Sequence, residues 1–247
     1  MNQSAHLHIS NTSDLGPVFE VTQQRLGEAL ARHPEVASRL TVSVSHDGNG
    51  LDDGLARADV VFCWDLPRDD LARRAPRLKL IHAHAAGVSH LMPLDWLPEG
   101  VQLANSRGIH GERAAEYAMM AVLMLNNRVP EMVANQRAAL WKQLFNTAVA
   151  GKTLLIVGVG SVGGSVATLA AHFRLRVIGI RRTGGPHPSV EAMYTPDALP
   201  ELIPQADFIL VTAPLTQASR HLIGAAEIAS MKPGAGLVCY SRAGLVD

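Results

Sequence analysis

Short apolar runs alternate with helix-type periodicity along the first hundred residues of the chain. Uninterrupted apolar runs are typical of buried strands, and apolar positions three or four residues apart are typical of helices. This alternation favours a parallel sheet with helices on its faces. The predicted strands are residues 7–9, 41–45, 60–64 and 78–84, with 101–106 a strand or a linker, and the predicted helices are residues 18–30 and 69–74.

The second half of the chain contains a stretch with the order of a dinucleotide-binding βαβ unit. An apolar run at residues 154–157 leads into the spacing GxGxxG, then a helix rich in small residues, then a second apolar run at 177–180. Such glycines make a tight turn, let the backbone approach a pyrophosphate and let helix and strand pack closely, with the pyrophosphate at the helix N-terminus. We predict a nucleotide site here rather than a merely structural turn. Its predicted residues are Gly158, Gly160, Ser161, Val162 and Gly163.

These patterns predict an α/β protein with two domains. Residues 1–104 form a flavodoxin-like α/β substrate domain, because no glycine motif follows its first strand. Residues 105–247 form a dinucleotide-binding domain with a Rossmann-type, doubly wound parallel sheet. Two further apolar runs, 208–211 and 237–240, bring the strands of this second domain to four, where about six are usual. We therefore expect the second domain to be incomplete at its C-terminal end, and the family resemblance described below implies the same for the first domain.

The residues after the second strand of the nucleotide unit predict which cofactor binds. A site for NAD usually has an acidic residue here, which accepts hydrogen bonds from the ribose 2′-hydroxyl. This chain instead has Arg181, Arg182 and Thr183. Guanidinium groups bind a 2′-phosphate through charge-assisted hydrogen bonds, whereas a carboxylate would repel it. The sequence favours NADP(H) over NAD(H), with NAD(H) still possible, and the alternative is that both arginines are solvated surface charges.

Three loops that follow predicted strands carry the other candidate binding residues, because ligands of α/β sheets bind at the carboxyl ends of strands. Ala86 and Gly87 offer backbone N–H groups to a small carboxylate. Arg242 can bind a planar carboxylate bidentately and polarise an adjacent carbonyl. An ordinary turn and a surface ion pair are the alternatives for these two loops. Residues that we expect on the cofactor side are Thr212, Ala213, Pro214 and Ser241.

Composition excludes several classes of protein. A formal net charge of zero argues against a general nucleic-acid binder or a membrane-surface binder. The N-terminus lacks the pattern of a signal peptide, and no apolar run is long enough to span a bilayer, so we expect a cytoplasmic protein. Cys63 and Cys239 lie in apolar runs and are expected to be reduced core residues. His82 and His84 share a face of a strand, but two histidines do not make a metal site, and none is predicted.

A helix in residues 111–128 is the candidate for subunit contacts. Residues 114–125 are apolar on nearly every side of a helix and too short to cross a membrane. A helix of this kind has to be buried all round. It is either a central helix between the domains or also part of a homodimer interface, which we favour. A second helix is expected at residues 130–141.

Five segments together resemble the D-isomer-specific 2-hydroxyacid dehydrogenases, and in particular the glyoxylate and hydroxypyruvate reductases. They are AAGVSHL, RGIHGERAAEY, GVGSVGGSVA, ADFILVTAPLT and MKPGAGLVCYSRAGLVD, in the order of the family from about Leu78 onward. The resemblance implies a two-domain oxidoreductase that transfers hydride between a nicotinamide and a small 2-oxo or 2-hydroxy acid such as glyoxylate or hydroxypyruvate. It implies that Arg242 is the catalytic arginine, which orients the substrate, and that Ala86 and Gly87 supply N–H groups to it.

The family pattern also places a glutamate and an acid/base histidine downstream of this arginine, and the chain ends at Asp247 without them. We therefore expect a fragment with little or no turnover, since a positioned proton donor contributes roughly 10² to 10⁴-fold in rate. His84 and His110 are the nearest substitutes by position, and both are expected to be structural. The competing hypothesis is a non-enzymatic NADP(H)-binding regulator or redox sensor on the same fold.

Overall fold

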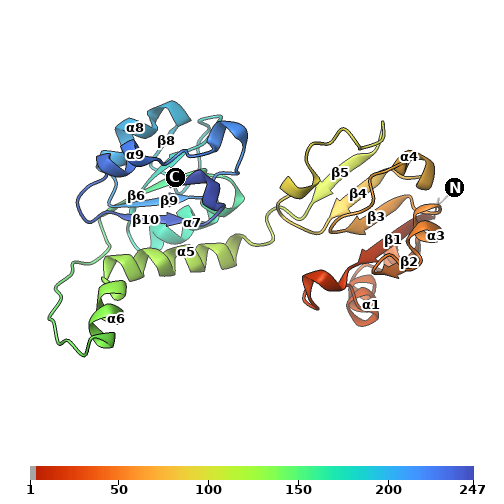
Figure 1. The fold of residues 1–247 in the computed structure, drawn as a ribbon, viewed down its shortest axis with the longest axis horizontal. Helices are drawn as coiled ribbons and strands as arrows, with labels where there is room; N and C mark the ends of the chain where they lie inside the picture. Colours follow the sequence, from red (N-terminus) through yellow and green to blue (C-terminus); the bar gives the residue numbers. More distant parts are fainter. Residues whose placement is uncertain (1–3) are drawn as a thin grey trace. The chain divides into compact units, whose positions relative to one another are not determined.

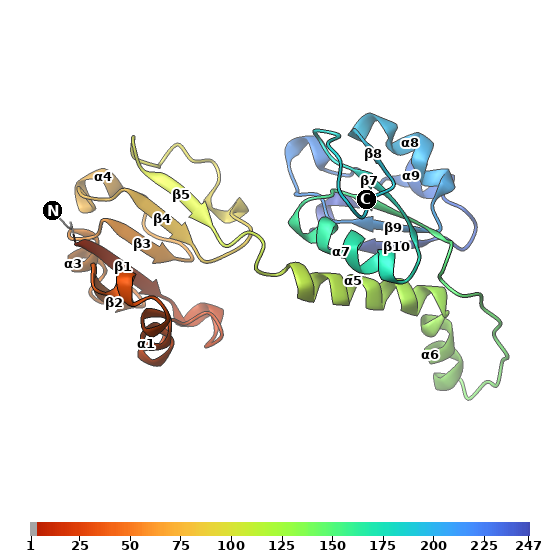
Figure 2. The same ribbon diagram turned by 180° about the vertical axis from the view of Figure 1, so that it is seen from behind.

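The computed structural model describes residues 4–247. The chain divides into two compact units, Met1–Arg107 and Gly108–Asp247, drawn from red to yellow and from yellow-green to blue in Figures 1 and 2. The sequence places the domain boundary between residues 104 and 105, which lies inside strand β5 (Gln102–Asn105). The structure assigns the whole of β5 to the first unit.

The first unit is a five-stranded parallel sheet in the order β2-β1-β3-β4-β5. This is the flavodoxin-like strand order, as predicted. Residues 101–106 therefore contain a strand and not only a linker. The other strands are β1 (Ala5–Asn11), β2 (Leu40–His46), β3 (Val60–Cys63) and β4 (Leu80–Ala83). The helices are α1 (Gln23–Arg32), α2 (Pro34–Ala37), α3 (Leu51–Leu55) and α4 (Leu71–Arg74).

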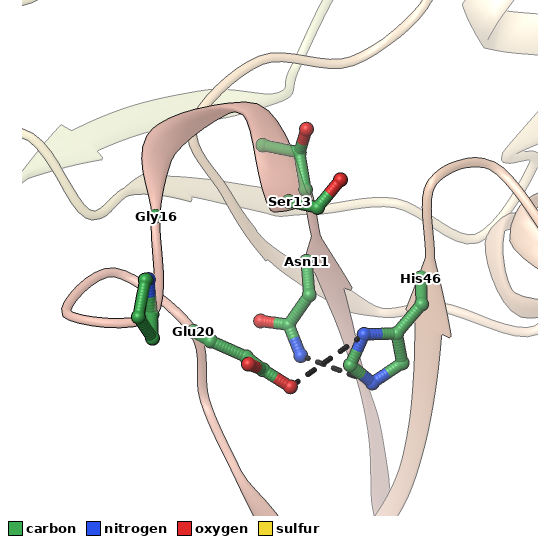
Figure 3. Close-up of a pocket in the computed structure, with 7 residues that line it drawn as sticks. Asn11, Ser13, Gly16, Glu20 and His46 are labelled. Atoms are coloured by element: carbon green, nitrogen blue, oxygen red, sulfur yellow. Dashed lines mark hydrogen bonds and ion pairs between the residues drawn. The ribbon is translucent and has the colours of Figure 1, made fainter.

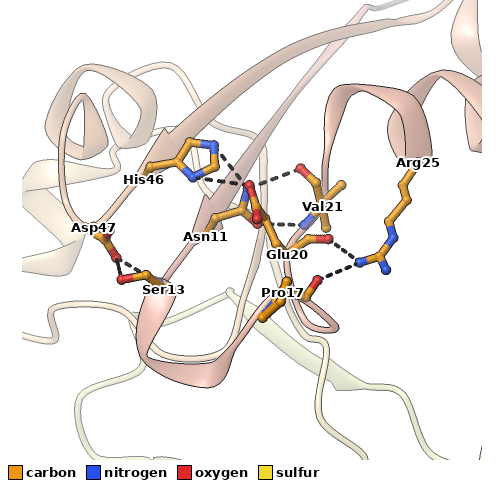
Figure 4. Close-up of polar contacts among 8 residues, drawn as sticks. All are labelled: Asn11, Ser13, Pro17, Glu20, Val21, Arg25, His46 and Asp47. Carbon is orange, nitrogen blue, oxygen red and sulfur yellow. Dashed lines mark hydrogen bonds and ion pairs between the residues drawn. The ribbon is translucent and has the colours of Figure 1, made fainter.

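Helix α1 starts later than the helix predicted at residues 18–30. Thr22 caps it, and its side chain accepts a hydrogen bond from the Arg25 N–H at 3.2 Å. The Arg25 guanidinium donates to the carbonyls of Pro17 at 3.1 Å and Glu20 at 2.6 Å, which holds the preceding loop outside the helix (Figure 4). Val18, whose spacing suggested a helix, is 71% exposed in that loop.

The same loop is tied to the carboxyl ends of β1 and β2. The Asn11 amide accepts from the Val21 N–H at 2.9 Å and donates to the Val21 carbonyl at 3.1 Å, as a neighbouring strand would. His46 lies 3.7 Å from the Glu20 carboxylate (Figure 4). A small pocket of about 150 Å³ remains between the loop and these strand ends (Figure 3).

The second unit is a five-stranded parallel sheet in the order β10-β9-β6-β7-β8. This is the order 3-2-1-4-5 of a Rossmann sheet, which confirms the predicted fold class. The count of four strands was wrong, because β8 pairs with β7 but has only three residues, too few to stand out as a strand in the sequence. The strands are β6 (Thr153–Val157), β7 (Arg176–Ile180), β8 (Ala192–Tyr194), β9 (Phe208–Val211) and β10 (Gly236–Cys239). The helices are α5 (Gly111–Asn126), α6 (Val129–Arg137), α7 (Ser161–His172), α8 (Leu199–Leu202) and α9 (Ala225–Ser230).

Helices cover both faces of this second sheet (Figures 1 and 2). Successive side chains of a strand point to opposite faces. Leu154 and Ile156 accordingly join the core beneath α5 and α7, and Leu155 and Val157 join the core beneath α8. All five residues of β6 are buried, which is why this strand is one uninterrupted apolar run after Thr153.

Helices α5 and α6 differ from their predicted forms. One face of α5 packs against α7, but Tyr117, Met120 and Met124 on another face are 58%, 46% and 39% exposed. The chain by itself therefore does not bury α5 on every side, and the predicted homodimer interface would have to cover the exposed face. Helix α6 ends at Arg137, so the predicted helix at 130–141 is too long, and Trp141 is 94% exposed in the segment that follows.

The two cysteines also differ from each other. Cys63 is buried, and desolvation, together with the nearby Asp65 charge, raises the pKa of its thiol to about 12. Cys239 is exposed, so its assignment to the core was wrong. Neither forms a disulfide. Across residues 4–247, no helix has the length and hydrophobicity needed to cross a bilayer.

Candidate functional site

The turn after β6 can only be made by glycine. Gly158 has a φ of +107°, a conformation that side chains rarely adopt. A Cβ atom here would lie 2.4 Å from the backbone nitrogen of Ala213, so any side chain would collide with the neighbouring loop. The N–H groups of Gly158 and Val159 donate to the carbonyl of Ile180 at 2.8 and 3.0 Å. The turn is thereby fixed to the end of β7.

The third glycine brings α7 close to the turn and the strand. A Cβ atom on Gly163 would lie 2.5 Å from the Gly158 carbonyl oxygen and 2.8 Å from the Thr212 hydroxyl. That hydroxyl donates to the Gly158 carbonyl at 2.7 Å, and the N–H groups of Thr212 and Ala213 donate to the Val157 carbonyl. Thr212 and Ala213, predicted as cofactor-binding residues, therefore support the glycine turn from behind. Pro214 is exposed beside them.

The N-terminus of α7 presents unpaired N–H groups. The first bond across the cap is from the Gly164 N–H to the Gly160 carbonyl, so the N–H groups of Ser161, Val162 and Gly163 precede the helical ladder. Gly160 occupies the cap position and has no side chain to satisfy them, and the first turn contains no acidic residue. Donors of this kind at the positive end of a helix dipole bind anions.

The loop after β7 holds the two predicted phosphate-binding arginines in different environments. Arg181 is partly buried, and its guanidinium donates to the Pro186 carbonyl at 3.1 Å. Arg182 and Thr183 are exposed. The sequence alone gives no sign of this difference, because it depends on how the loop folds back.

The loop after β10 carries Ser241 and Arg242. Within residues 4–247, the buried hydroxyl of Ser241 has no hydrogen-bond partner. Arg242 is exposed and donates to the Ser241 carbonyl at 2.9 Å, and no acidic side chain of the described chain pairs with it. The next turn is fixed by bonds from the N–H groups of His221 and Ile223 to the carbonyls of Gly244 and Leu245. The turn thus holds in place a guanidinium that has no acidic partner among residues 4–247.

The candidate carboxylate loop of the first unit follows β4. The Ser106 N–H donates to the Ala85 carbonyl at 3.1 Å, and the Asn105 amide donates to the Ala86 carbonyl at 2.9 Å. In a trans peptide the C=O and N–H groups point in opposite directions. The N–H groups of Ala86 and Gly87 are therefore turned away from Asn105 and Ser106, and neither donates to an acceptor in the part of the chain that the structure describes.

An aromatic cluster that the sequence analysis missed borders this loop. The rings of Trp64 and His90 stack with their centroids 4.6 Å apart, and Trp64 also lies 5.7 Å from His84 and 6.0 Å from Phe19. Burial lowers the pKa of His84, with smaller contributions from His82 and His90. A tryptophan directly after an apolar strand was the available signal. Its neighbours come from distant segments, so their grouping could not be predicted.

No metal site emerges from the histidines. His82 donates to or accepts from the Ser106 hydroxyl at 3.1 Å, and His84 lies in the aromatic cluster. Between residues 4 and 247, no group of three or more His, Cys, Asp or Glu side chains is placed to hold a metal ion. His110 caps α5 without a side-chain hydrogen bond and is exposed.

The two units therefore hold separate parts of the predicted site. In the second unit, the glycine turn, the α7 N-terminus and the loops that begin at Arg181, Thr212 and Ser241 all follow the carboxyl ends of strands of one sheet. Ala86 and Gly87 follow the carboxyl end of β4 in the first unit. The second unit has what a dinucleotide needs, namely an uncapped helix N-terminus and a glycine cradle that a Cβ would fill. The strand order and this cradle define a dinucleotide-binding α/β protein.

Comparison with known proteins narrows this class. Residues 119–247 match the model of the NAD binding domain of the D-isomer specific 2-hydroxyacid dehydrogenases. That match covers more than half of the chain, so the chain belongs to this family, as the sequence motifs predicted.

Individual proteins that the chain is similar to are members of the same family. The chain is 30% identical over 197 residues to a glyoxylate reductase of Thermococcus litoralis, covering 76% of this chain and 60% of that protein. It is 32% identical over 186 residues to glyoxylate/hydroxypyruvate reductase B of Pectobacterium atrosepticum, covering 72% and 58%. It also resembles a crystal structure of the NADPH-dependent glyoxylate/hydroxypyruvate reductase of Sinorhizobium meliloti in complex with NADP and sulfate. That match has a TM-score of 0.77 and 25% identity, and covers 98% of this chain and 74% of that one. The chain thus spans little more than half the length of the two curated relatives.

Proposed function

We propose that the protein acts in the NADP(H)-dependent reduction of a small 2-oxo acid such as glyoxylate or hydroxypyruvate. The observation that carries this proposal is the uncapped N-terminus of α7 behind the Gly158 turn, in a chain of the 2-hydroxyacid dehydrogenase family. The relatives named above are glyoxylate and hydroxypyruvate reductases, which supports the choice of substrate class.

Each group has one proposed task. The N–H groups of Ser161 and Gly163 bind the pyrophosphate, and the nicotinamide supplies hydride when bound. The N–H groups of Ala86 and Gly87 bind the substrate carboxylate. Arg242 binds the 2-oxo acid and polarises its carbonyl, for which an unpaired guanidinium is suited. The proton donor is the histidine that the family resemblance implies downstream of Arg242.

The preference for NADP(H) rests on the loop after β7. Its exposed Arg182 and Thr183 supply a guanidinium and a hydroxyl where an NAD site has a carboxylate. The solved relative that contains NADP is a NADPH-dependent reductase, which supports the same preference.

Binding and turnover should be measured side by side on the chain. We expect titration with NADPH to quench the tryptophan fluorescence of the protein, with energy transfer to the nicotinamide. NADH should bind more weakly. Gly163→Val, which forces α7 away from the glycine turn, should abolish binding of both nucleotides, whereas Gly27→Ala, in open space on α1, should leave it unchanged. Absorbance at the nicotinamide band, followed with glyoxylate and with hydroxypyruvate, then measures turnover. Failure of wild-type chain to bind either nucleotide would refute the proposal, and binding without oxidation at any chain length would instead favour a regulator.

We also propose that the protein forms a homodimer through the region of residues 111–128. The exposed face of α5 continues over an apolar groove between α5 and α7, which includes Met120, Met124 and Phe173. The segment after α6 adds Trp141 and Phe145, which are 94% and 79% exposed. An exposed apolar groove and exposed aromatic side chains of this kind are typical of an interaction site.

The dimer can be tested by light scattering coupled to size exclusion. The wild-type chain should have twice the monomer mass. Met120→Glu places a charge in the groove and should shift the mass toward that of the monomer, while Glu28→Lys on α1 should not. A monomeric wild-type chain at micromolar concentration would overturn this part of the proposal.

A further inference from the structure

The loop after β7 is prebuilt around the side chain of Arg181. Arg181 continues the pairing of β7, because its N–H donates to the Tyr194 carbonyl at 3.0 Å. The chain then turns sharply, with a bond of 3.1 Å from the Gly184 N–H to the Arg181 carbonyl and a φ of +62° at Gly184. Across this turn, the guanidinium donates to the Pro186 carbonyl at 3.1 Å.

Gly185 leaves the space that the guanidinium occupies. A Cβ atom on Gly185 would lie 2.5 Å from Nη2 of Arg181 and 3.5 Å from Cζ. The Nε edge of the same guanidinium is buried and finds no acceptor within residues 4–247. One edge of Arg181 is therefore buried and one Nη2–H bond is committed to the Pro186 carbonyl, so this side chain is packed into the loop that follows it, unlike the exposed Arg182.

The far end of the loop is fixed to α7. The Ser189 N–H donates to Nδ1 of His187 at 3.2 Å, so the opposite ring nitrogen, Nε2, carries the proton of the neutral ring. The His187 ring packs on Gly164, where a Cβ atom would lie 2.9 Å from Nε2. The Ser189 hydroxyl lies 3.3 Å from that of Thr168 on the same helix. One end of the loop is thus bonded to β8 and the other is held against the helix whose N-terminus begins the pyrophosphate site.

We infer that the two adjacent arginines have different tasks: Arg182, with Thr183, contacts the 2′-phosphate of NADP(H), and Arg181 is a positioning residue that shapes the loop presenting them. This inference rests on the proposed preference for NADP(H). Discrimination between the two nucleotides then depends on a loop that is already folded before the cofactor binds. A preorganised loop loses little conformational entropy on binding.

Two kinds of variant separate contact from positioning. Arg182→Gln removes the contact and should weaken NADPH binding about 10- to 100-fold, as loss of a charge-assisted hydrogen bond does, with NADH binding unchanged. Arg181→Gln should weaken NADPH binding less, by roughly 3- to 10-fold, since the contact survives on a loosened loop. Gly185→Ala displaces the guanidinium without altering any charge and should act like Arg181→Gln. Arg181→Lys keeps one donor and should be intermediate.

Amide hydrogen exchange of the ligand-free chain supplies the second measurement. Arg181→Gln and Gly185→Ala should accelerate exchange at Gly184, Ser189 and Val190, and Arg182→Gln should not. Titration with adenosine 2′,5′-bisphosphate and adenosine 5′-monophosphate isolates the phosphate from the rest of the cofactor.

Three results would decide against these assignments. Unchanged exchange in both Arg181→Gln and Gly185→Ala would overturn the positioning role whichever nucleotide binds. Equal losses of bisphosphate affinity in Arg181→Gln and Arg182→Gln, without faster exchange, would make Arg181 a direct contact. An unchanged ratio of NADPH to NADH affinity in Arg182→Gln would instead refute the proposed preference for NADP(H).

Discussion

The interiors of the two sheets are built on different chemistry. In the second unit, β6 is buried at all five positions and, apart from Thr153, consists of aliphatic residues. In the first unit, β1 carries His8 at 0% exposure and Ser45 of β2 lies beside it at 1%. The first unit also has an apolar core, around Leu55, Val61 and Ile81, so the same parallel architecture tolerates buried polar groups beside such a core, provided that each finds a partner.

The two buried polar residues belong to a row of alternating imidazoles and hydroxyls that runs inward from the exposed Thr41. His6 lies 2.9 Å from the Thr41 hydroxyl and 2.8 Å from that of Ser43. His8 lies 2.8 Å from the same Ser43 hydroxyl and 3.0 Å from that of Ser45. Parallel pairing of β1 with β2 sets these neighbours, because His6, His8 and their partners share one face of the sheet.

Truncation in the aliphatic sheet should have the largest effect. Ile156→Ala removes a fully buried side chain at the centre of the second unit, and such changes cost about 2–5 kcal/mol. The loss should appear as a lower urea midpoint followed by circular dichroism. The exposed Ile228→Ala serves as the control and should shift the midpoint little. A loss below about 1 kcal/mol for Ile156→Ala would contradict the description of β6 as a fully packed strand.

The second largest loss of stability is expected from adding a methyl group next to the row of imidazoles. A Cβ atom on Gly54 of α3 would lie 2.1 Å from the His8 ring, which is itself enclosed. Gly54→Ala should therefore destabilise the first unit by about 1–3 kcal/mol through overpacking, despite the higher helix propensity of alanine. The loss can be measured by tryptophan fluorescence in a Trp141→Phe background, because the remaining tryptophans, Trp64 and Trp96, both lie in the first unit. Gly27→Ala in α1, where the space is open, should be neutral or stabilising.

Acidification should have a smaller and graded effect, confined to the first unit. Burial lowers the pKa of His8, and His6 and Arg57 lower it further. Burial likewise lowers the pKa of His6, with Arg57 and Arg77 lowering it and Asp59 opposing them. Once the pH falls below about 6.5, the unfolded chain therefore binds more protons than the folded one. Each histidine then lowers the free energy of unfolding by at most about 1.4 kcal/mol for every further decrease of one pH unit.

Tryptophan fluorescence in the Trp141→Phe background, measured in urea between pH 7.5 and pH 5.5, tests this slope. His8→Gln keeps hydrogen-bonding groups but does not titrate, and should flatten part of the pH dependence. A first unit whose midpoint is the same at both pH values would show that the row accepts protons freely.

The difference between the two interiors also explains what the sequence could predict. Residues 154–157 and 177–180 are aliphatic runs and were placed correctly, and the glycine turn between them depends on backbone geometry that only glycine supplies. Strand β1 was predicted as residues 7–9 because His6 and Ser10 interrupt the apolar pattern, although it spans Ala5–Asn11. The polar residues belong to the strand because their partners lie on β2, which no local pattern reveals.

The candidate site divides in the same way. The cradle at Gly158 and Gly163 and the arginine loop were visible as motifs. The separate environments of Arg181 and Arg182, the supporting role of Thr212, and the Trp64 cluster depend on contacts between segments far apart in the chain. Side-chain packing of this kind is a tertiary property, and spacing along the sequence carries little information about it.

The row of imidazoles has a direction. One assignment pairs a donor with an acceptor at every contact of the row: Thr41 donates to the Ala5 carbonyl at 3.5 Å and accepts from His6, Ser43 donates to His6 and accepts from His8, and Ser45 donates to His8. Both rings then carry their proton on Nδ1, the form less common for free histidine in water, and the bond dipoles add along the strand. A hydroxyl donates once but can accept twice, so reversing His8 alone would leave two ring nitrogens sharing the single proton of Ser43. The tautomer of His8 is therefore coupled to that of His6, and nitrogen resonances of the two rings should report a shared process.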